Sequence, residues 1–373
     1  MTKYRFDQIA RECRETYSGN YKDVPIVGLE HIIPNEMLLS DCNKNVETTF
    51  TKSFKKGQIL FGRRRAYQRK ACVATFDGIC SGDITVIEAI EGAISAKLLP
   101  FIIQSDDFFE HAIKGSNGAL SPRVKWEHMS NFEIELSSLS EQEILADKLW
   151  AAYELKRSYQ DMIKATDEMV KSQFIERFSA MTTTPVKTYV DDSFPGEWGT
   201  EDTIGDGVKV IRTTNFTNSG KLNLADVVTR SIEDRKVSRK QIKKYDTILE
   251  RSGGTADNPV GRVVLFEEDD LFLCNNFTQV LRFKDIDPRF AFYSLYYFYQ
   301  TNKTAIRSMG SKTTGIQNLN MSKYLEIGIP NASDEEQKEF VAIAEQADKS
   351  KFELKKAIEA IDKVIKSLIN ENL

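Results

Sequence analysis

The sequence predicts an α/β (α+β) protein in which two mixed α/β domains are joined by two long antiparallel coiled-coil helices. Two observations support this fold class. The chain repeats itself at an interval of about 195 residues, and each copy ends in a helical stretch with one apolar stripe. The repeat is clearest where residues 167–174 align with residues 362–369 and where residues 129–134 align with residues 321–327. A duplicated domain and helix predict internal pseudo-twofold symmetry.

The bulk composition is that of a folded, soluble chain. At 373 residues it can form two domains, each with its own core. It is 41% hydrophobic and 28% charged, which excludes a disordered tail. The start lacks the apolar core of a secretory signal, so we expect a cytoplasmic protein without membrane contact. The five cysteines form no Cys-x-x-Cys pair, and we expect reduced thiols.

The two predicted helices are heptad-like and uninterrupted by proline or glycine. Their apolar residues follow alternating steps of three and four, which predicts one packing stripe on each helix. The residues expected to pack between the helices are Leu145, Leu149, Tyr159, Ile163, Val170, Phe340, Leu354, Ile358, Ile361 and Ile365. Ser140 and Ser333 stand before acidic first turns, each with a glutamate three residues later, so we expect two capping boxes.

Ahead of each helix lie short β-branched and aromatic runs separated by Gly, Asn and Asp turns, which is typical of strands. These runs are residues 57–61, 84–87, 208–211, 262–266 and 279–283. The threonine run before Pro185 predicts a hinge at residues 181–185. The predicted order is a first domain at 1–138, a first long helix at 139–180, a second domain at 181–331 and a second long helix at 332–373.

The net charge of -4 argues against a protein that coats nucleic acid by bulk electrostatics. The basic charge is local, however, because residues 54–70 carry seven lysines and arginines and no acid. Arginine binds phosphate and reads guanine edges, and glutamine pairs with adenine. The DNA contacts expected in the first domain are Arg63, Arg64, Arg65, Tyr67, Gln68, Arg69 and Lys70 of this loop, with Ser116, Asn117, Ser121 and Arg123 of a later loop.

The second domain has a similar framework with different loop chemistry. Residues 243–249 mirror residues 55–60, and further segments gather amides, hydroxyls and one lysine, the groups that read base edges without strong phosphate attraction. The contacts expected there are Arg212, Thr213, Asn215, Arg251, Ser252, Thr255, Asn276, Thr278, Lys312, Thr313, Thr314 and Gln317. The alternative for each is an ordinary turn residue, and for the first loop a solvated basic surface.

Two helices with matching stripes in one chain pack most easily antiparallel, which would place the domains at opposite ends. A helix of about 33 residues is roughly 50 Å long at ~1.5 Å per residue. That length spans roughly 14 base pairs at ~3.4 Å per base pair. Two DNA-reading domains on such a rod would address two short half-sites with an unread gap. The alternative is that the helices form a dimerisation stalk.

In combination these features resemble the specificity (S) subunit of type I restriction-modification systems, over essentially the whole chain. The resemblance rests on the helix starts at Ser140 and Ser333, on residues 57–70 and 76–82, and on the loops at 115–118 and 310–315. It implies two target-recognition domains that each bind half of a bipartite site in double-stranded DNA. It further implies that the helices bind two methyltransferase (M) subunits and, through them, restriction (R) subunits. The chain opens directly into its first domain, whereas some members begin with a helical segment, so a rearranged form stays open.

Motifs for catalysis are missing from the sequence. There is no Asn/Asp-Pro-Pro-aromatic loop for a flipped base and no Gly-rich cofactor turn. His31, His111 and His128 are isolated in sequence from ligand-type neighbours. We therefore expect no catalytic residue, metal or cofactor in this chain, and catalysis in other subunits. Two alternatives stay open: a protein-only scaffold or dimerisation module, and a degenerate restriction enzyme with its own nuclease activity.

Overall fold

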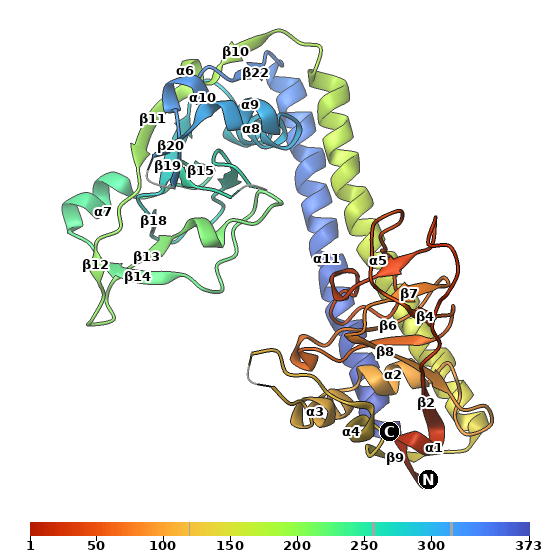
Figure 1. Ribbon diagram of the computed structural model, residues 1–373. Coiled ribbons are helices and arrows are strands. Elements are labelled where there is room, and N and C mark those ends of the chain that lie inside the picture. The colour runs from red at the N-terminus through yellow and green to blue at the C-terminus, as the bar shows by residue number, and fades with distance from the viewer. Residues whose placement is uncertain (119, 256–257, 314–315) are drawn as a thin grey trace. The chain divides into compact units, whose positions relative to one another are not determined.

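The computed structural model describes all residues except 119, 256, 257, 314 and 315. It divides into two units, one of Met1–Asp161 with Leu354–Leu373 and one of Met162–Glu353. Each unit contains a mixed α/β domain and a segment of both long helices (Figure 1). The mixed α/β fold with long helices is as the sequence predicts. The predicted boundaries at the helix ends differ from this division, because both helices contribute to both units.

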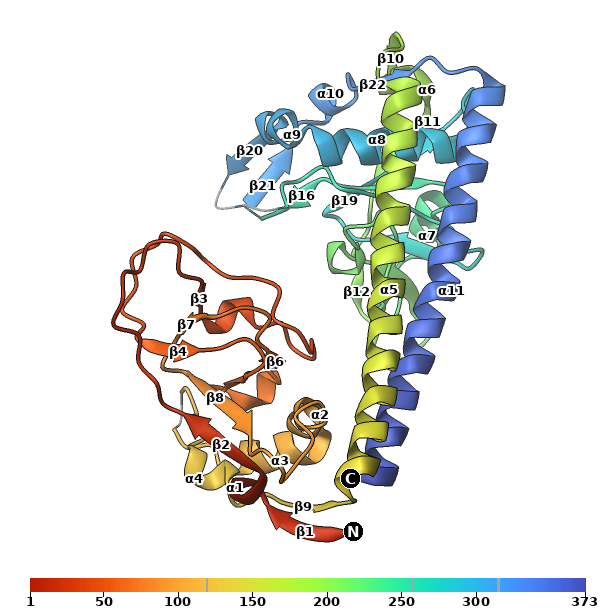
Figure 2. The ribbon, with the colours of Figure 1, turned by 90° about the vertical axis from the view of Figure 1, so that its right-hand side faces the viewer.

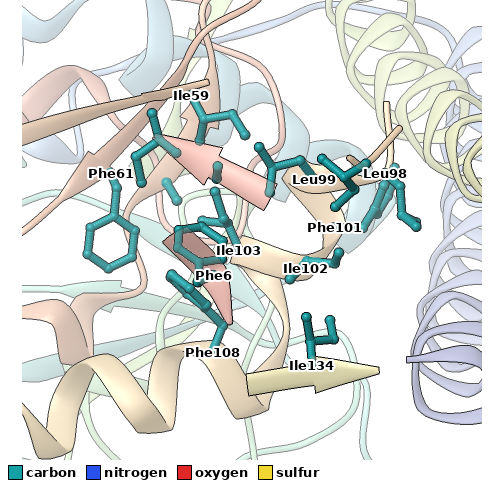
Figure 3. Packing of buried hydrophobic residues seen from close by; sticks show 14 of the residues in the cluster. Phe6, Ile59, Phe61, Leu98, Leu99, Phe101, Ile102, Ile103, Phe108 and Ile134 are labelled. Atoms are coloured by element: carbon teal, nitrogen blue, oxygen red, sulfur yellow. The ribbon is translucent and has the colours of Figure 1, made fainter. Parts of the chain in front are cut away.

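The domain of unit 1 is built on a four-stranded sheet covered by short helices. Its strands are β1 (Thr2–Arg5), β2 (Ala10–Cys13), β3 (Ile26–Val27), β4 (Lys52–Phe54), β5 (Ile59–Gly62), β6 (Ala71–Val73), β7 (Gly78–Cys80), β8 (Ile84–Ala89) and β9 (Glu133–Leu136). Its short helices are α1 (Phe6–Ile9), η1 (Leu29–His31), η2 (Ala66–Gln68), α2 (Leu99–Gln104), α3 (Asp106–Lys114) and α4 (Trp126–Met129). The sheets run β2-β8-β5-β6, β3-β7-β4 and β1-β9. Phe6, Phe61 and Phe108 form the aromatic centre of the core (Figure 3).

The domain of unit 2 repeats this plan with additions. Its strands are β10 (Thr183–Pro185), β11 (Val190–Pro195), β12 (Thr200–Glu201), β13 (Val208–Ile211), β14 (Val228–Ser231), β15 (Thr247–Glu250), β16 (Ser252–Gly253), β17 (Val263–Leu265), β18 (Phe272–Cys274), β19 (Thr278–Phe283), β20 (Gly310–Thr313), β21 (Ile316–Leu319) and β22 (Gly328–Pro330). Its short helices are α6 (Val186–Tyr189), η3 (Thr213–Asn215), α7 (Asp234–Lys240), α8 (Pro288–Thr301), α9 (Lys303–Met309) and α10 (Met321–Tyr324).

Strand order is the same in the principal sheets of the two domains. The sheet β11-β19-β15-β17 of unit 2 corresponds strand by strand to β2-β8-β5-β6 of unit 1. Each domain also has a parallel strand pair in its second sheet, β3 with β7 and β13 with β18. The strands expected from β-branched runs at 57–61, 84–87, 208–211, 262–266 and 279–283 are all present, with bounds that differ by at most two residues.

The two long helices are α5 (Leu139–Phe178) and α11 (Asp334–Asn372). In unit 1 they lie side by side, and Lys156 Nζ is 2.7 Å from Asp362 Oδ1 (Figure 1). In unit 2 the two helices again lie side by side (Figure 2). There Lys351 Nζ is 2.5 Å from Asp167 Oδ1. Lys351 and Asp362 stand 195 residues after Lys156 and Asp167. The repeat in sequence therefore recurs as a repeated ion pair, one in each unit.

The structure places the predicted helix-packing residues at two levels of burial. Leu145, Leu149, Val170 and Phe340 are buried. The half-buried members are Tyr159, Ile163, Leu354, Ile358, Ile361 and Ile365. The buried members belong to the domain cores, and the half-buried Ile365 packs against the core of unit 1. The other half-buried members lie in the middle of α5 and in the later turns of α11.

One predicted capping box is wrong by two residues. Helix α5 begins at Leu139, and its cap is Ser138, whose N and Oγ both donate to Glu141 Oε2, at 3.0 and 2.8 Å. Ser140 already lies inside the first turn and cannot act as a cap. The second prediction is confirmed, since Ser333 and Glu336 form the equivalent box before α11.

The predicted hinge at 181–185 is also corrected. Its last three residues form β10, which pairs antiparallel with β22. Thr183, Thr184 and Pro185 lie opposite Pro330, Ile329 and Gly328. The threonines favour extended backbone, and the main-chain N–H and C=O groups of the two strands form hydrogen bonds with one another. This segment is therefore part of the second domain.

A buried glutamine ties the start of each long helix to its domain. Gln142 Oε1 accepts a bond from Ser95 N at 3.0 Å, and Gln142 Nε2 donates to Ser137 O at 2.9 Å. Gln337, 195 residues later, accepts from Asp287 N at 3.0 Å. Buried amides are retained where all their hydrogen bonds are made. These glutamines therefore set the position of each helix against the domain before it.

Replacing Phe340 with alanine should destabilise unit 2 by about 3–5 kcal/mol, the usual cost of emptying an aromatic core site. Phe340 is fully buried, with ring centroids 5.2 Å from Phe174 and 5.4 Å from Tyr293. Urea unfolding measures the change. Met169→Ala is the matched control, since Met169 is 48% exposed on α5, and should cost under about 0.5 kcal/mol. Equal losses in both variants would contradict this assignment of the core.

Candidate nucleic-acid interface

The basic loop of the first domain follows the buried strand β5 and turns sharply. Arg65 and Arg69 flank η2, and both adopt left-handed backbone with φ of 54°. Such a conformation is uncommon outside glycine and persists only where the surroundings enforce it. The turn leaves the Tyr67 side chain 56% exposed at its tip. The backbone thus presents an aromatic ring and its neighbouring cations to solvent.

Main-chain hydrogen bonds join this loop to the second predicted loop of the domain. Arg63 N donates to Asp83 O, and Arg63 O accepts from Val124 N, both at 2.9 Å. Arg65 N donates to Pro122 O at 2.7 Å, and residues 64 and 123 form an antiparallel bridge. Segments that are about 60 residues apart in sequence therefore form one surface. We call it the first surface, defined as Arg63, Arg64, Arg65, Tyr67, Gln68, Asn117, Ser121 and Arg123.

Asp83 is the carboxylate in contact with the arginines of the first surface. Its Oδ1 accepts from Arg123 Nε at 2.7 Å, and its Oδ2 lies 3.6 Å from Arg64 Nη1. The hydrogen bond from Arg123 holds the pKa of Asp83 below its usual value, against the opposing effect of burial. Arg64 also donates to Ser121 Oγ at 3.1 Å.

The first surface retains hydrogen-bonding capacity. The Nε atoms of Arg63, Arg64 and Arg65 are buried without a hydrogen-bond partner among the described residues. A buried unpaired donor is costly unless something supplies an acceptor. The side chains of Arg64 and Arg123 are 39% and 43% exposed, and exposed guanidinium donors bind phosphate and guanine. The first surface is therefore chemically suited to nucleic acid.

Three residues predicted as DNA contacts serve the fold of the first domain instead. Arg69 Nη2 is 2.9 Å from Asp106 and donates to Gln104 O at 3.1 Å. Lys70 Nζ donates to a main-chain carbonyl in η1 at 2.6 Å, and the Ser116 hydroxyl donates to one in α3 at 3.0 Å. The sequence could not separate these residues from their neighbours, because all lie in the same polar loops. We leave them out of the first surface.

The second domain repeats the backbone framework of the first surface. Arg251, like Arg63, follows a central strand, and its N donates to Phe277 O at 2.8 Å. Its O accepts from Leu319 N at 2.8 Å. Strand β16 then pairs with β21, and β21 with β20, so the predicted segments around 252, 277 and 317 come together (Figure 2).

The outward residues here are polar, with one aromatic that the sequence analysis missed. Phe277 is 41% exposed in the loop between β18 and β19. An apolar residue between two polar ones, directly after a buried strand, was the signal that could have found it. We call Arg251, Thr255, Asn276, Phe277 and Gln317 the second surface. Lys312 and Thr313 lie on β20 of the same small sheet, whereas the predicted Thr314 is outside the described residues.

Two predicted contacts of the second domain are buried. Thr278 is fully buried, and its hydroxyl donates to Asn275 O at 2.7 Å. Ser252 is 6% exposed, and its hydroxyl donates to Asn318 Oδ1 at 2.7 Å. Both lie in strands, where alternate residues point inward. Their hydroxyls stabilise the loop framework and are removed from the predicted interface.

The predicted contacts at 212–215 form a structural turn. Asn215 is buried, and its Oδ1 accepts from Arg212 N at 2.8 Å. His31 Nδ1 accepts from Gly28 N at the same distance in the first domain. Arg212 is further held by Asp226 at 2.9 Å, and Thr213 is half-buried. The turn is a second shared framework element, and we remove its three predicted residues from the interface.

The histidines show no metal-site geometry. No group of three His, Cys, Asp or Glu side chains that could hold a metal ion occurs in the described part of the chain. His111 and His128 are not isolated, as the sequence suggested, but stack with ring centroids 4.3 Å apart. Each Nε2 lies 2.8 Å from the main-chain oxygen of the other. This pair joins α3 to α4.

A comparison with protein-family models gives one match in this chain. Residues 200–362 match the model of the type I restriction modification DNA specificity domain. This match confirms the resemblance seen in the sequence, and it covers most of the second domain with the second surface. A search of curated proteins finds no match.

Solved structures of similar fold cover the whole chain. A chain from a structure of the assembly and conformational transition of a type I R-M system aligns with a TM-score of 0.56 and 15% identity, covering 100% of this chain and 97% of that one. The type I restriction-modification S subunit from M. genitalium aligns with a TM-score of 0.57 and 13% identity, covering 98% of this chain and 95% of that one. At this identity the likeness establishes the fold. The fold of this chain is thus similar to that of the S subunit from M. genitalium.

No helix in the described ranges is long and apolar enough to span a membrane.

Proposed function

We propose that this chain is the non-catalytic specificity subunit of a type I restriction-modification complex, and that each domain reads one half of a bipartite DNA target. The observation that carries the proposal is the shared framework. Arg63 and Arg251 each follow a central strand. Each residue makes two main-chain hydrogen bonds, one through its N to one polar loop and one through its O to another. The match of residues 200–362 to a DNA specificity domain supports the second surface directly. Double-stranded DNA is therefore the proposed ligand of both domains.

The two surfaces differ in chemistry, so the two half-sites should differ in sequence. The first surface carries three consecutive arginines beside an exposed tyrosine. It favours guanine edges and phosphate. The second surface carries amides, a hydroxyl, one arginine and the exposed Phe277 ring, which suit adenine edges and the thymine methyl group. Shape and bridging water also contribute to such readout, so the surfaces define classes of contact and not a base sequence.

The triple variant Arg63→Ala, Arg64→Ala, Arg65→Ala should weaken recognition of one half-site and leave the other intact. Each lost base contact is worth about 1–3 kcal/mol. Methylation of a randomised plasmid library by the chain with its M subunits measures both half-sites at once. The matched variant Arg251→Ala, Asn276→Ala should affect the opposite half-site. Equal loss at both half-sites in either variant would contradict the assignment.

DNA binding at several salt concentrations and a nuclease assay of the purified chain separate the proposal from its alternatives. A protein-only scaffold predicts no sequence preference at any salt concentration. A degenerate nuclease predicts that the purified chain alone cuts plasmid DNA in the presence of Mg²⁺. Neither result is expected, because the proposal assigns the chemistry to other subunits and needs no cofactor in this chain.

We further propose that α5 and α11 form an antiparallel coiled coil that sets the spacer between the half-sites. Helix α5 is one helix of 40 residues, about 60 Å long at ~1.5 Å per residue. The ion pairs Lys156–Asp362 and Lys351–Asp167 support one register for the pair, with pseudo-twofold symmetry. In this arrangement the length of the helices determines the number of base pairs between the two half-sites.

Inserting four residues after Tyr159 and four after Ile358 should lengthen the spacer by roughly one or two base pairs. One helical turn adds about 6 Å, and a base pair rises ~3.4 Å. The methylated motifs of cells that carry the variant measure the spacer. The sequences of both half-sites should stay the same. An unchanged spacer in a folded variant would refute the role of the helices as a ruler.

We also propose that α5 binds the M subunits, two per chain, with R subunits joined through them. An uncharged stripe runs along its exposed face at alternating steps of four and three. Its residues are Ala151, Leu155, Ser158, Met162, Ala165 and Met169. A stripe of exposed, mostly apolar residues on an otherwise charged helix indicates a protein contact. One of the similar structures comes from an assembled type I R-M system.

Replacing Leu155, Met162 and Met169 with lysine should reduce binding of M subunits at least tenfold, because three charges would have to be desolvated at the contact. Co-purification with tagged M subunits and gel filtration measure the loss. The triple variant Glu154→Gln, Asp161→Asn, Glu168→Gln is the control, because it raises the charge of neighbouring positions on α5 by the same three units. Equal loss in both variants would point to charge alone, and full binding by the stripe variant would refute the docking face.

A further inference from the structure

A negative charge stands inside the first surface, where phosphate binding alone would disfavour it. The segments 63–70 and 115–125 contain no acid of their own. Asp83 comes from a third segment, the turn before β8, and its side chain is only 21% exposed. It lies between Arg64 of one loop and Arg123 of the other.

The position of this carboxylate is itself well determined. Asp83 N donates to Ser81 Oγ at 3.2 Å, and Asp83 O accepts from Arg63 N at 2.9 Å. Its side chain therefore extends from a backbone that is bonded on both sides. Arg123 approaches through Nε at 2.7 Å and through Nη2 at 3.3 Å, so both carboxylate oxygens contact one guanidinium. Two-point contacts of this kind fix the plane of the arginine as well as its distance.

We infer that Asp83 is a positioning residue, which holds Arg64 and Arg123 in the orientation that selects the bases of the first half-site. The inference rests on the proposed function of the first surface. Bidentate reading of guanine requires that a guanidinium lie in the plane of the base edge. A free arginine side chain visits many rotamers and binds phosphate well without this constraint. Asp83 restricts the rotamers of these two arginines before DNA binds. Its negative charge also weakens the attraction of the first surface for DNA phosphates.

The second domain shows that the framework does not need this carboxylate. The residue whose carbonyl accepts from Arg251 is Phe277, in the place that Asp83 has opposite Arg63. The main-chain bonds are made there without any acid side chain at that position. The carboxylate of Asp83 is thus an addition to the shared framework, in the domain where neighbouring arginines need to be oriented.

The test is Asp83→Asn in the full chain with its M subunits, compared with the wild type on two duplexes. One duplex contains the target, and the other has its first half-site scrambled. Removing the charge should strengthen binding to the scrambled duplex about two- to fivefold at low salt. Discrimination between the two duplexes should fall roughly tenfold, because the arginines lose their fixed orientation. The lost charge strengthens binding to any duplex, whereas the lost orientation weakens binding to the target. Loss of folding would instead weaken binding to both duplexes.

Asp77→Asn is the matched control. It changes the charge of the same domain equally, and the Asp77 carboxylate accepts a hydrogen bond from Lys56 N, outside the first surface. It should leave discrimination unchanged. Asp83→Glu keeps the charge and moves the carboxylate, so it should lower discrimination without strengthening binding to the scrambled duplex. Circular dichroism at increasing temperature reports whether each variant folds.

The possible results separate the inference from the function on which it rests. A wild type that binds both duplexes equally would overturn the proposed function itself. A wild type that discriminates, with Asp83→Asn and Asp83→Glu discriminating as well as it does, would overturn the role of Asp83 alone. If the asparagine variant unfolds, the glutamate variant decides between these results.

Discussion

Aromatic and aliphatic residues of the long helices complete the cores of both domains, and the arrangement of each unit depends on this packing. In unit 2, Phe174, Phe178 and Phe340 pack around Phe290 of α8, with ring centroids between 5.0 and 6.3 Å apart. In unit 1, Leu145 and Leu149 occupy the same core cluster as the domain. Burying such groups is the main favourable term in folding. A helix end cannot leave its domain without opening that core.

Each domain core supports polar loops that follow the central strands β5 and β15. The framework bonds around Arg63 and Arg251 are made by main-chain atoms, so they do not depend on which side chains the loops carry. This separation allows one loop set to be basic and the other rich in amides. It also explains why buried Asn215 and Thr278 are polar without facing outward, since both satisfy main-chain groups of the loops.

Several features were predictable because they depend on local spacing. The repeat, the two long helices, the principal strands and the outward position of Tyr67 follow from periodicity and composition. The start of α5 was missed because Ser138 and Ser140 both have a glutamate three residues later, so the motif fits twice. The sequence could not exclude Arg69 and Lys70 from the interface, because their partners are distant in sequence. It could not exclude Ser252 and Thr278 either, because their burial depends on the register of the strands.

The sequence by itself determined the class of fold, the duplication and the amphipathic stripes, because these depend on residues three, four or about 195 positions apart that can be compared directly. Tertiary structure decided which polar residues reach solvent. It joined the loop after β5 to residues 121–124 and placed Asp83 between two arginines. Such contacts join segments with no common pattern, and they exist only once the sheet has set its register and the core has closed.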